Sequence, residues 1–480
     1  MIRMTVADML EATQAALVAG LASTTFEGVQ IDSRLVRRGT AFVALPGERV
    51  DGNDYVEAAI EAGAHVVVVT RAVDPIALEM AMLHGVAVVR AARDDGEEFM
   101  LRLARAWRER NLQWTVVGVT GSVGKTTTKD MLAAALATTR RTHATKGNFN
   151  NLLGVPLTLF GASSSDEAIV VEMGMNMPGE MERLTDVVQP NVAVVTNVGT
   201  SHIGNLGSRE GIARAKAQIT SRMREMEGIP GPTIVLTDGD DFADLIENEY
   251  ATPAGILVMR VGPSQASSVH ADVLSIDENG LPTVRLTFSD GLVLEGLLPL
   301  PGRAMVFDLL SAMGAAWALN APREEAFAGI QAMRATRMRL EVRKAQGAPR
   351  VIDDSYNASP ASIAAALEVL CTMACSGRRV AVIGEVGELG AQSQRLHGLI
   401  GAYAAAKPLD MLVFVGGEAA DVMADAALTM GFSADKMERF ATSDAAAKVL
   451  GPILEPRDLV LAKGSRSVGL DRFVEGVLKR

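Results

Sequence analysis

The sequence predicts an α/β protein with three domains, each built around a largely parallel sheet. The chain has 480 residues, and single hydrophobic cores rarely grow beyond about 250–300 residues, so more than one domain is expected. Hydrophobic residues make up 48% and charged residues 21%, as in ordinary globular proteins. Short apolar strands alternate with helical segments along the chain, which is typical of parallel sheets flanked by helices.

The first domain is predicted over residues 1–92. Its expected elements are three short strands and an alanine-rich helix, at residues 28–32, 41–45, 65–70 and 54–62. The charged stretch at 92–98 precedes an amphipathic helix at 99–110 and marks the boundary to the second domain. The second domain, residues 93–322, is predicted to contain a strand, a glycine-rich turn, a helix and two more strands, at 115–120, 121–124, 129–136, 168–171 and 192–196.

The third domain is predicted over residues 323–480, where the strand and helix pattern restarts. Its expected elements are two helices, four strands and a closing helix, at 323–333, 360–373, 350–353, 379–383, 411–415, 459–461 and after residue 461. This second repeat of strands and helices indicates an open sheet of the Rossmann type.

Composition and charge disfavour several classes of function. The net charge is −11 and aromatic residues make up 4%, so no basic, aromatic surface for nucleic acid is expected. No apolar run reaches the roughly 18–20 residues that cross a bilayer, and the N-terminal residues show no apolar signal segment. Cys371 and Cys375, four residues apart, cannot make a disulfide framework. We therefore expect a cytoplasmic protein without membrane insertion.

The strongest motif is a glycine-rich turn between a predicted strand and a predicted helix. Glycines turn the backbone tightly and present its N–H groups to phosphate oxygens, and the following helix adds partial positive charge at its N-terminus. Lys125 is expected to reach the β- and γ-phosphates of a nucleotide and Thr126 to bind Mg²⁺. The motif is the shorter G-x-x-G-K-T-T form, and the alternative is a turn that binds no ligand. The predicted nucleotide-binding residues are Thr120, Gly121, Ser122, Val123, Gly124, Lys125, Thr126 and Thr127.

A phosphate loop alone would serve a kinase, a GTPase, an ATPase or a ligase, although no guanine-reading N-K-x-D motif accompanies this one. Glu172 ends an apolar strand, His202 follows the next strand, and Lys216 lies in a short helix. A carboxylate, an imidazole and the loop threonine can hold Mg²⁺ against a triphosphate. Taken singly, each of the three residues could equally be a capping, loop or surface group.

These motifs, in this order, resemble those of the Mur ligases, and the resemblance runs over nearly the whole chain. The D-D-S-Y-N-A-x-P run at residues 353–360 is the most specific, and is similar to the branch that uses D-alanyl-D-alanine. The other matching segments are Asp32-Ser33-Arg34, residues 39–45, residues 147–156, residues 172–180, Glu388-Leu389-Gly390 with His397, and Lys463-Gly464-Ser465-Arg466.

The resemblance implies an N-terminal UDP-sugar-binding domain, a central ATPase-like domain and a C-terminal ligase domain. It implies that ATP phosphorylates the terminal carboxylate of UDP-N-acetylmuramoyl-tripeptide, and that the amine of D-alanyl-D-alanine attacks the acyl phosphate. The product would serve peptidoglycan synthesis, and the enzyme would be a monomer. The sequence leaves open whether the third peptide residue is meso-diaminopimelate or L-lysine.

The resemblance also implies roles for single residues. Lys125, His202 and Lys216 are expected to be catalytic, and Lys216 to be carbamylated, which turns a cation into an anion beside Mg²⁺. The expected Mg²⁺ contacts come from Thr126, Glu172, His202 and Lys216. The expected contacts to UDP and the muramoyl peptide come from Ser33, Arg34, Asn148 and Asn151. The expected contacts to ATP after domain closure come from Arg339 and Asp354, and those to the dipeptide from Asn357 and Ser359. Arg34 could instead form a surface salt bridge. The two asparagines could instead cap a turn.

Two departures from the family pattern affect the nucleotide site. The family's G-R-H-N-x-x-N segment reads adenine with its asparagines, whereas residues 302–308 here retain only Asp308 as a polar candidate. Met338 replaces the glycine that usually precedes Arg339.

Two rival interpretations remain. A folylpolyglutamate synthetase would lack the first domain, and a nucleotide-gated scaffold would not need Lys125, Glu172 and Lys216 together.

Overall fold

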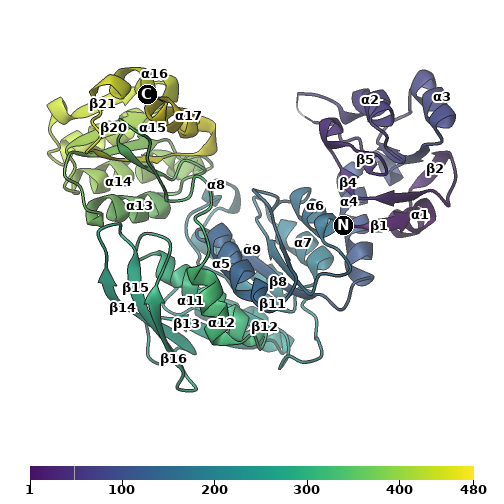
Figure 1. Cartoon of the computed structure of the whole chain (residues 1–480), viewed down its shortest axis with the longest axis horizontal. Coiled ribbons are helices and arrows are strands. Elements are labelled where there is room, and N and C mark those ends of the chain that lie inside the picture. Colours follow the sequence, from purple (N-terminus) through teal and green to yellow (C-terminus); the bar gives the residue numbers. More distant parts are fainter. Residues whose placement is uncertain (48, 480) are drawn as a thin grey trace.

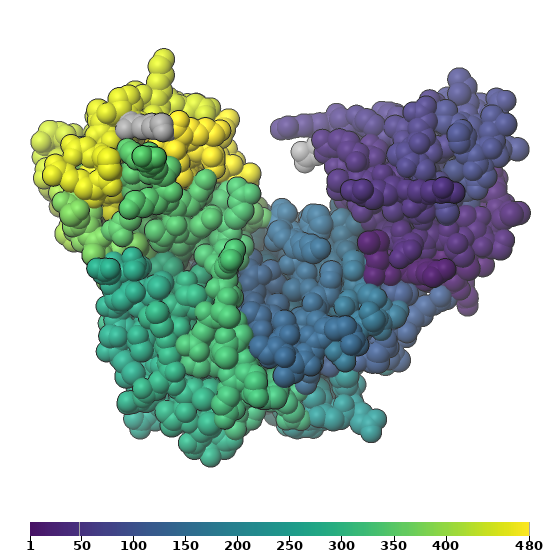
Figure 2. Space-filling view, viewed as in Figure 1, coloured from purple at the N-terminus to yellow at the C-terminus, as the bar shows by residue number. Residues whose placement is uncertain are grey.

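The computed structural model describes residues 1–47 and 49–479, and the described chain forms four sheets. Figure 1 shows them in three bodies, with the central body below and the N-terminal and C-terminal bodies rising on either side. The predicted three-part α/β fold is confirmed. The space-filling view shows a hollow between the N-terminal and C-terminal bodies (Figure 2).

The N-terminal body contains a two-stranded sheet, β1-β3, and a five-stranded sheet in the order β2-β7-β6-β5-β4. Strands β4 to β7 run parallel, and all four valines of β6 are buried because helices and loops cover both faces. Of the strand expected at 28–32, only two residues pair. The elements are β1 Arg3–Thr5, α1 Val6–Thr13, β2 Ala16–Ala19, β3 Thr25–Glu27, β4 Val29–Gln30, β5 Ala41–Val43, α2 Val56–Glu61, β6 Val66–Val69, α3 Pro75–His84 and β7 Ala87–Arg90.

Helix α4, Gly96–Glu109, joins the N-terminal and central bodies. It begins three residues before the expected position, because the Asp95 side chain caps it by accepting from the Glu98 N–H. Its buried residues Phe99 and Trp107 belong to a single hydrophobic core that contains Val66 of the first sheet and Val116 of the second. The two bodies therefore share one core.

The central body is a nine-stranded sheet in the order β16-β15-β14-β13-β12-β11-β8-β10-β9. The strands from β9 to β14 run parallel, and β14, β15 and β16 form antiparallel hairpins that the sequence analysis did not anticipate. Helices α5, α11 and α12 cover one face, and α4, α6, α7 and α9 cover the other. The sheet strands are β8 Thr115–Thr120, β9 Thr142–Ala144, β10 Ala168–Glu172, β11 Val192–Val195, β12 Thr233–Thr237, β13 Leu257–Gly262, β14 Val269–Ile276, β15 Pro282–Phe288 and β16 Val293–Leu297.

Two helices of the central body differ from expectation. Helix α5 begins at Lys125 rather than at residue 129, because Gly124 adopts a φ of 85° and lets the loop turn directly into the helix. Helix α12 had been grouped with the third domain, but its residues Phe327 and Ile330 pack in the core beneath the central sheet. The helices are α5 Lys125–Ala137, α6 Gly154–Gly161, α7 Glu180–Val188, α8 Ile203–Leu206, α9 Arg209–Ala217, α10 Ala243–Ile246, α11 Met305–Ala318 and α12 Arg323–Gln331.

The C-terminal body is a six-stranded sheet in the order β17-β18-β22-β19-β20-β21. All pairs except β17 with β18 are parallel, and helices cover both faces, as in an open Rossmann-type sheet. The elements are β17 Glu341–Arg343, β18 Arg350–Asp353, α13 Pro360–Thr372, β19 Arg379–Gly384, α14 Ser393–Ala405, β20 Met411–Val415, α15 Glu418–Thr429, β21 Met437–Phe440, α16 Ser443–Leu450, β22 Leu459–Lys463 and α17 Leu470–Leu478. Among residues 1–47 and 49–479, no helix combines the length and apolar character needed to cross a bilayer.

Candidate active site

The phosphate loop connects the carboxyl end of β8 to α5 and is shaped by two glycines. Gly121 has a φ of 149° and Gly124 a φ of 85°. A Cβ atom on Gly121 would lie 1.8 Å from Thr196 Oγ1, and one on Gly124 would lie 2.1 Å from Asp308 Oδ1. Both positions therefore require glycine for reasons of space as well as of backbone conformation.

The segment after β11 holds the loop in place. Asn197 Oδ1 accepts from the Val123 N–H at 3.0 Å, and Asn197 Nδ2 donates to the Val123 carbonyl at 2.9 Å. Thr196 Oγ1 donates to the same carbonyl at 2.6 Å, and the Gly199 N–H donates to Ser122 Oγ at 2.8 Å. These contacts join residues more than seventy positions apart. The loop is therefore preorganised by Asn197, a residue that the sequence analysis did not select.

Lys125 lies across the loop that precedes it. Its Nζ donates to the Gly121 carbonyl at 2.8 Å. Burial lowers the pKa of Lys125, and the nearby Arg339 lowers it further, whereas Glu172 acts in the opposite direction. The ammonium group thus sits where the loop would enclose an anion, and its charge is only partly balanced by the protein.

Thr126 and Glu172 form an oxygen-rich corner beside Lys125. Because β10 lies parallel to β8 with Glu172 in register with Val119, the end of β10 brings its carboxylate next to the loop. Thr126 Oγ1 donates to Glu172 Oε2 at 2.8 Å, and Asn150 Nδ2 donates to Glu172 Oε1 at 2.8 Å. Glu172 is 2% exposed. Asn150 was not selected from the sequence, although it lies between the two selected asparagines.

The asparagines selected from the sequence lie on the same turn as Asn150. Asn151 Oδ1 accepts from the Gly154 N–H at 2.8 Å and so caps the start of α6, which is the alternative role considered for it. The Asn148 carbonyl accepts from the Asn150 N–H at 2.7 Å, within the turn.

Lys216 is buried on α9 with 2% exposure, and its amine makes no hydrogen bond among the described residues. Burial, with a smaller contribution from Lys125, lowers the pKa of Lys216 well below its usual value. Both effects favour the neutral form of the amine, which is the nucleophilic form of lysine.

Asp308, on α11, lies behind the phosphate loop. It is 5% exposed and accepts from Thr128 Oγ1 at 3.2 Å. Burial raises the pKa of Asp308 to about 8. The carboxyl group is therefore protonated at neutral pH and can donate a hydrogen bond as well as accept one, unlike the acceptor expected from the sequence.

His202 connects the central body to the C-terminal body. It immediately precedes α8 and has a φ of 63°, and its Nδ1 is in contact with a carboxylate oxygen of Glu388. This contact lowers the pKa of Glu388. Glu388 belongs to a motif that supports the family resemblance but was not selected as a site residue.

Other residues of the C-terminal body also face the phosphate loop. The guanidinium of Arg339 lies 4.4 Å from the ring centroid of Tyr356. Burial raises the pKa of Tyr356, and both Arg339 and Glu172 influence it, so these three groups are close together. Asp354 Oδ2 lies 2.6 Å from Lys463 Nζ, which also donates to the Asn357 carbonyl at 3.0 Å.

The remaining selected residues divide between two bodies. The Ser359 side chain caps α13 by accepting from the Ser362 N–H, while Asn357 is exposed. Ser33 and Arg34 lie in the N-terminal body. The Arg34 side chain is 86% exposed and makes a two-bond pair with Asp32, with distances of 2.9 and 2.7 Å. The structure thus brings Arg339 of the C-terminal body near Lys125 and Asp308, and His202 against Glu388, whereas Ser33 and Arg34 lie in the chain's first body.

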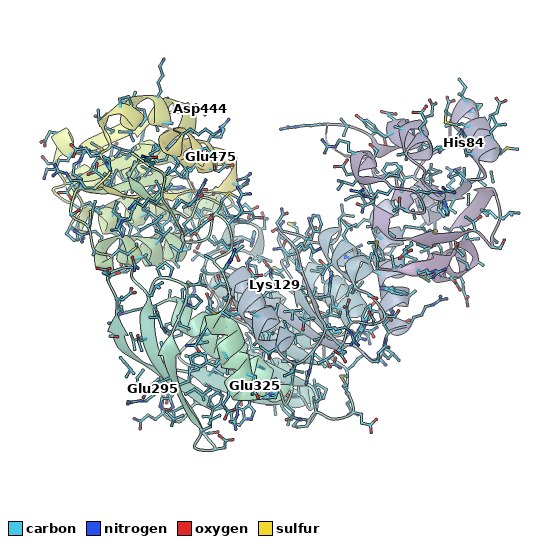
Figure 3. All side chains as sticks on the ribbon, viewed as in Figure 1. His84, Lys129, Glu295, Glu325, Asp444 and Glu475 are labelled. Atoms are coloured by element: carbon cyan, nitrogen blue, oxygen red, sulfur yellow. The ribbon has the colours of Figure 1, made fainter. Side chains whose placement is uncertain are left out.

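Lys129, labelled in Figure 3, lies on α5 of the central body. Lys129 Nζ donates to the Thr145 carbonyl at 2.9 Å and pairs with Asp130, so this lysine is already neutralised. Among the lysines named above, Lys125 and Lys216 have no carboxylate in salt-bridge contact within the described residues.

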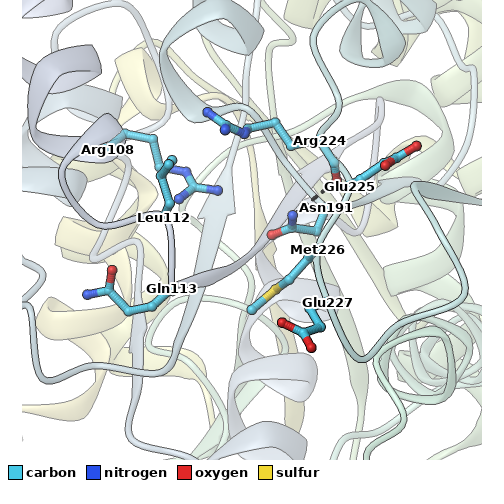
Figure 4. A pocket seen from close by; sticks show the side chains of 8 residues that line it. All are labelled: Arg108, Leu112, Gln113, Asn191, Arg224, Glu225, Met226 and Glu227. Carbon is cyan, nitrogen blue, oxygen red and sulfur yellow. Dashed lines mark hydrogen bonds between the residues drawn. The ribbon is translucent and has the colours of Figure 1, made fainter.

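A pocket of about 480 Å³ lies away from this site (Figure 4). Asn191 immediately precedes β11, and Gln113 lies two residues before the start of β8, so the pocket is at the opposite end of the strands from the phosphate loop. Arg108 is buried there and donates to the Val188, Asn111 and Gln189 carbonyls. The lining residues are Arg108, Leu112, Gln113, Asn191, Arg224, Glu225, Met226 and Glu227. We therefore assign the candidate active site to the phosphate loop rather than to this pocket.

Comparison with known families agrees with the three bodies. The model of the Mur ligase family, catalytic domain matches residues 25–108, that of the Mur ligase middle domain matches 119–316, and that of the Mur ligase, glutamate ligase domain matches 338–466. The fold and the phosphate loop with its buried lysines define an ATP-dependent ligase, and the chain belongs to the Mur ligase family.

The relatives identify the branch of the family. The chain is 33% identical over 480 residues to UDP-N-acetylmuramoyl-tripeptide--D-alanyl-D-alanine ligase of Bacillus subtilis, covering 100% of this chain and 99% of that enzyme. A crystal structure of MurF from Acinetobacter baumannii has a TM-score of 0.86 and 31% identity, covering 100% and 99% of the two chains. MurF ligase from Thermotoga maritima in complex with ADP has a TM-score of 0.76 and 25% identity, covering 94% and 97%.

Proposed function

We propose that this protein uses ATP to join D-alanyl-D-alanine to UDP-N-acetylmuramoyl-tripeptide, giving the pentapeptide precursor of peptidoglycan, ADP and phosphate. The observation that carries the proposal is the similarity to the Bacillus subtilis ligase of this specificity, which extends over the whole of both chains. The N-terminal body, which folylpolyglutamate synthetases are not expected to have, supports the UDP-linked substrate. We further propose that the enzyme acts as a monomer in the cytoplasm, where ATP and nucleotide precursors occur.

The chemistry requires that a carboxylate be turned into an electrophile. Phosphorylation supplies a leaving group, and the site must bring two anions together while it stabilises the transferring phosphoryl group. We assign the phosphate cradle to residues 120–127 and the stabilising cation to Lys125. The amine of the dipeptide then attacks the acyl phosphate carbon, and the tetrahedral intermediate expels phosphate as the amide bond forms.

The residues around the loop fit Mg²⁺. The Thr126 hydroxyl and the buried Glu172 carboxylate lie 2.8 Å apart, and Mg²⁺ prefers oxygen ligands of this kind. We assign these two residues to one ion and His202 to a second. Bound Mg²⁺ would neutralise charge on the phosphates. Thr126 and Glu172 would then exchange their mutual hydrogen bond for contacts to the ion.

The environment of Lys216 supports carbamylation. The neutral amine would add to CO₂, forming an N–C bond and releasing one proton, which leaves an anionic carbamate in place of a lysine. The positive charge of Lys125, which disfavours a protonated Lys216, would instead attract the carbamate anion, and this anion would favour cations at the site. We therefore propose that Lys216 contributes to the Mg²⁺ site as its carbamate.

The remaining assignments concern substrate binding. We propose that Ser33 and Arg34 bind the UDP diphosphate, since the exposed Arg34 guanidinium can exchange Asp32 for phosphate oxygens. Asn148 and Asn151 would line the muramoyl-peptide channel, with Asn151 offering its amide nitrogen because its oxygen caps α6. Arg339, Asp354 and Asp308 would serve the nucleotide, and Asn357 and Ser359 the dipeptide, when the C-terminal body closes on the loop.

The decisive experiment measures phosphate release and product mass with the full-length protein. We expect phosphate release and the pentapeptide only when ATP, the UDP-tripeptide and D-alanyl-D-alanine are all present. Omission of each substrate is the control, and paired tripeptides ending in meso-diaminopimelate or L-lysine identify the third residue. Turnover with a folate and glutamate instead, or no turnover with either set, would overturn the proposal.

A further inference from the structure

The loop formed by residues 385–390 of the C-terminal body docks on α8 of the central body. The carboxylate of Glu388 contacts His202 Nδ1, and the Glu388 carbonyl accepts from the Gly204 N–H at 3.3 Å. Gly204 and Gly390 meet backbone to backbone. A Cβ on Gly204 would lie 2.9 Å from Gly390 N, and one on Gly390 would lie 2.7 Å from Gly204 Cα. The docked arrangement thus leaves no space for a side chain at either glycine.

The same loop is held rigidly within the C-terminal body. The Val386 N–H donates to Nε2 of the buried His397 at 3.0 Å, so the proton of this ring lies on Nδ1, which donates to the Ser393 carbonyl at 2.8 Å. On the other side, the Gly387 N–H donates to Ser465 Oγ at 2.7 Å, and the Ser465 N–H donates to the Glu385 carbonyl at 2.9 Å. These bonds fix the direction in which Glu388 points.

On the central body, the segment that carries His202 is connected to the phosphate loop. Ser201 Oγ donates to the Ser122 carbonyl at 3.2 Å, and the Gly199 N–H donates to Ser122 Oγ at 2.8 Å. No hydrogen bond of His202 Nε2 occurs among the described residues, and because Nδ1 makes the contact with Glu388, the second ring nitrogen is available.

Histidines that bind metal ions commonly hold their other ring nitrogen against a carboxylate, which fixes the tautomer and the ring orientation. We propose that Glu388 is a positioning residue that orients His202 for a divalent cation, so that the cation site is complete only when the C-terminal body is docked on α8. The proposal rests on the proposed function, because that function supplies the cation. Docking of the C-terminal body on α8 then raises the affinity for the cation, and cation binding raises the docking equilibrium constant by the same factor.

An ordinary interdomain salt bridge is the competing explanation. A partly exposed pair of this kind stabilises docking only slightly and would not affect a cation site. Loss of a carboxylate that orients a metal-binding histidine instead weakens metal binding by about 10–100-fold. Cation affinity therefore separates the two explanations, and it can be measured without turnover.

The test measures Mn²⁺ binding by electron paramagnetic resonance in the full-length protein, with a non-hydrolysable ATP analogue and no acceptor substrates. We expect Glu388→Ala to weaken Mn²⁺ binding by about 10–100-fold, and Glu388→Gln to weaken it less because an oxygen acceptor for Nδ1 remains. Glu368→Gln removes another paired carboxylate of the C-terminal body, on the exposed side of α13, and should bind Mn²⁺ as the wild type does.

A second variant tests docking while keeping both side chains. Gly204 lies within α8, where alanine is favourable, yet its Cβ would press on the Gly390 backbone. We expect Gly204→Ala to weaken Mn²⁺ binding and to speed amide hydrogen exchange at residues 203–207. If Glu388→Ala and Gly204→Ala bind Mn²⁺ with affinities within twofold of wild type, the inference about Glu388 is overturned, but the proposed function is not. Absence of Mn²⁺ and nucleotide binding in the wild type would overturn the proposed function as well.

Discussion

Asp308 should make the central body less stable as pH rises. Its pKa is about 8 in the folded protein and close to 3.8 in the unfolded chain, so the folded state binds more protons between these values. The stability that the neutral carboxyl contributes is therefore present at low pH and lost as pH rises toward 8. Each pH unit within this window corresponds to about 1.4 kcal/mol. Between pH 5 and pH 8 the loss amounts to about 4 kcal/mol.

Asp308→Asn removes the titration and keeps an oxygen that can accept from Thr128 Oγ1. We expect its free energy of unfolding, relative to wild type, to increase by about 4 kcal/mol between pH 5 and pH 8. Urea unfolding followed by tryptophan fluorescence measures this, because Trp107, Trp114 and Trp317 all lie in or beside the central body. The control is Asp290→Asn. Pairing with Arg323 lowers the pKa of Asp290, so this carboxyl is ionised in both the folded and the unfolded protein between pH 5 and pH 8. The reasoning would be refuted if the difference in free energy of unfolding between Asp308→Asn and wild type stayed constant within about 1 kcal/mol from pH 5 to pH 8.

Three further predictions concern catalysis. Lys125→Ala should abolish amide formation without unfolding the protein, measured as product formed at saturating ATP. The exposed Lys146→Ala is its control, and wild-type turnover in Lys125→Ala would contradict the assignment. Lys216→Ala should be nearly inactive and regain activity when a short carboxylic acid is added; retention of more than about a tenth of the activity, a loss below roughly 1.4 kcal/mol, would exclude the carbamate. Discrimination of ATP from ITP should be moderate because Ala304 and Met305 stand in place of the amide-bearing pair of the family; a kcat/KM ratio above about a thousand would show that other groups read the base.

The fold class could be predicted because buried parallel strands are nearly continuous apolar runs, as in β8 and β20. The hairpins of β14, β15 and β16 follow another pattern. The residues of β15 alternate between buried and more exposed positions, and the sequence of that strand carries this two-residue period, which could have revealed it. The grouping of α12 with the central body depends on packing against α5 and has no local signal.

The site could be predicted where one short segment carries the chemistry. The phosphate loop and the strand-end Glu172 are of this kind, since their positions follow from a strand, a turn and a helix. Asn197 and Glu388 escaped selection because their partners, Val123 and His202, are brought to them by sheet order and by the docking of two bodies. The pKa of Asp308 depends on the burial of this part of α11 against the phosphate loop, which no local pattern reports.

The core shared through α4 has a consequence for dividing the chain. Phe99 and Trp107 pack in one core with residues of both the first and the second sheet, so a fragment ending near residue 92 would leave an apolar face of the first sheet in water. The C-terminal sheet has its own cores on both faces, and only the segment between α12 and β17 connects it covalently to the rest. Truncation at that segment should yield two separately soluble pieces, whereas the first two domains are inseparable as folding units.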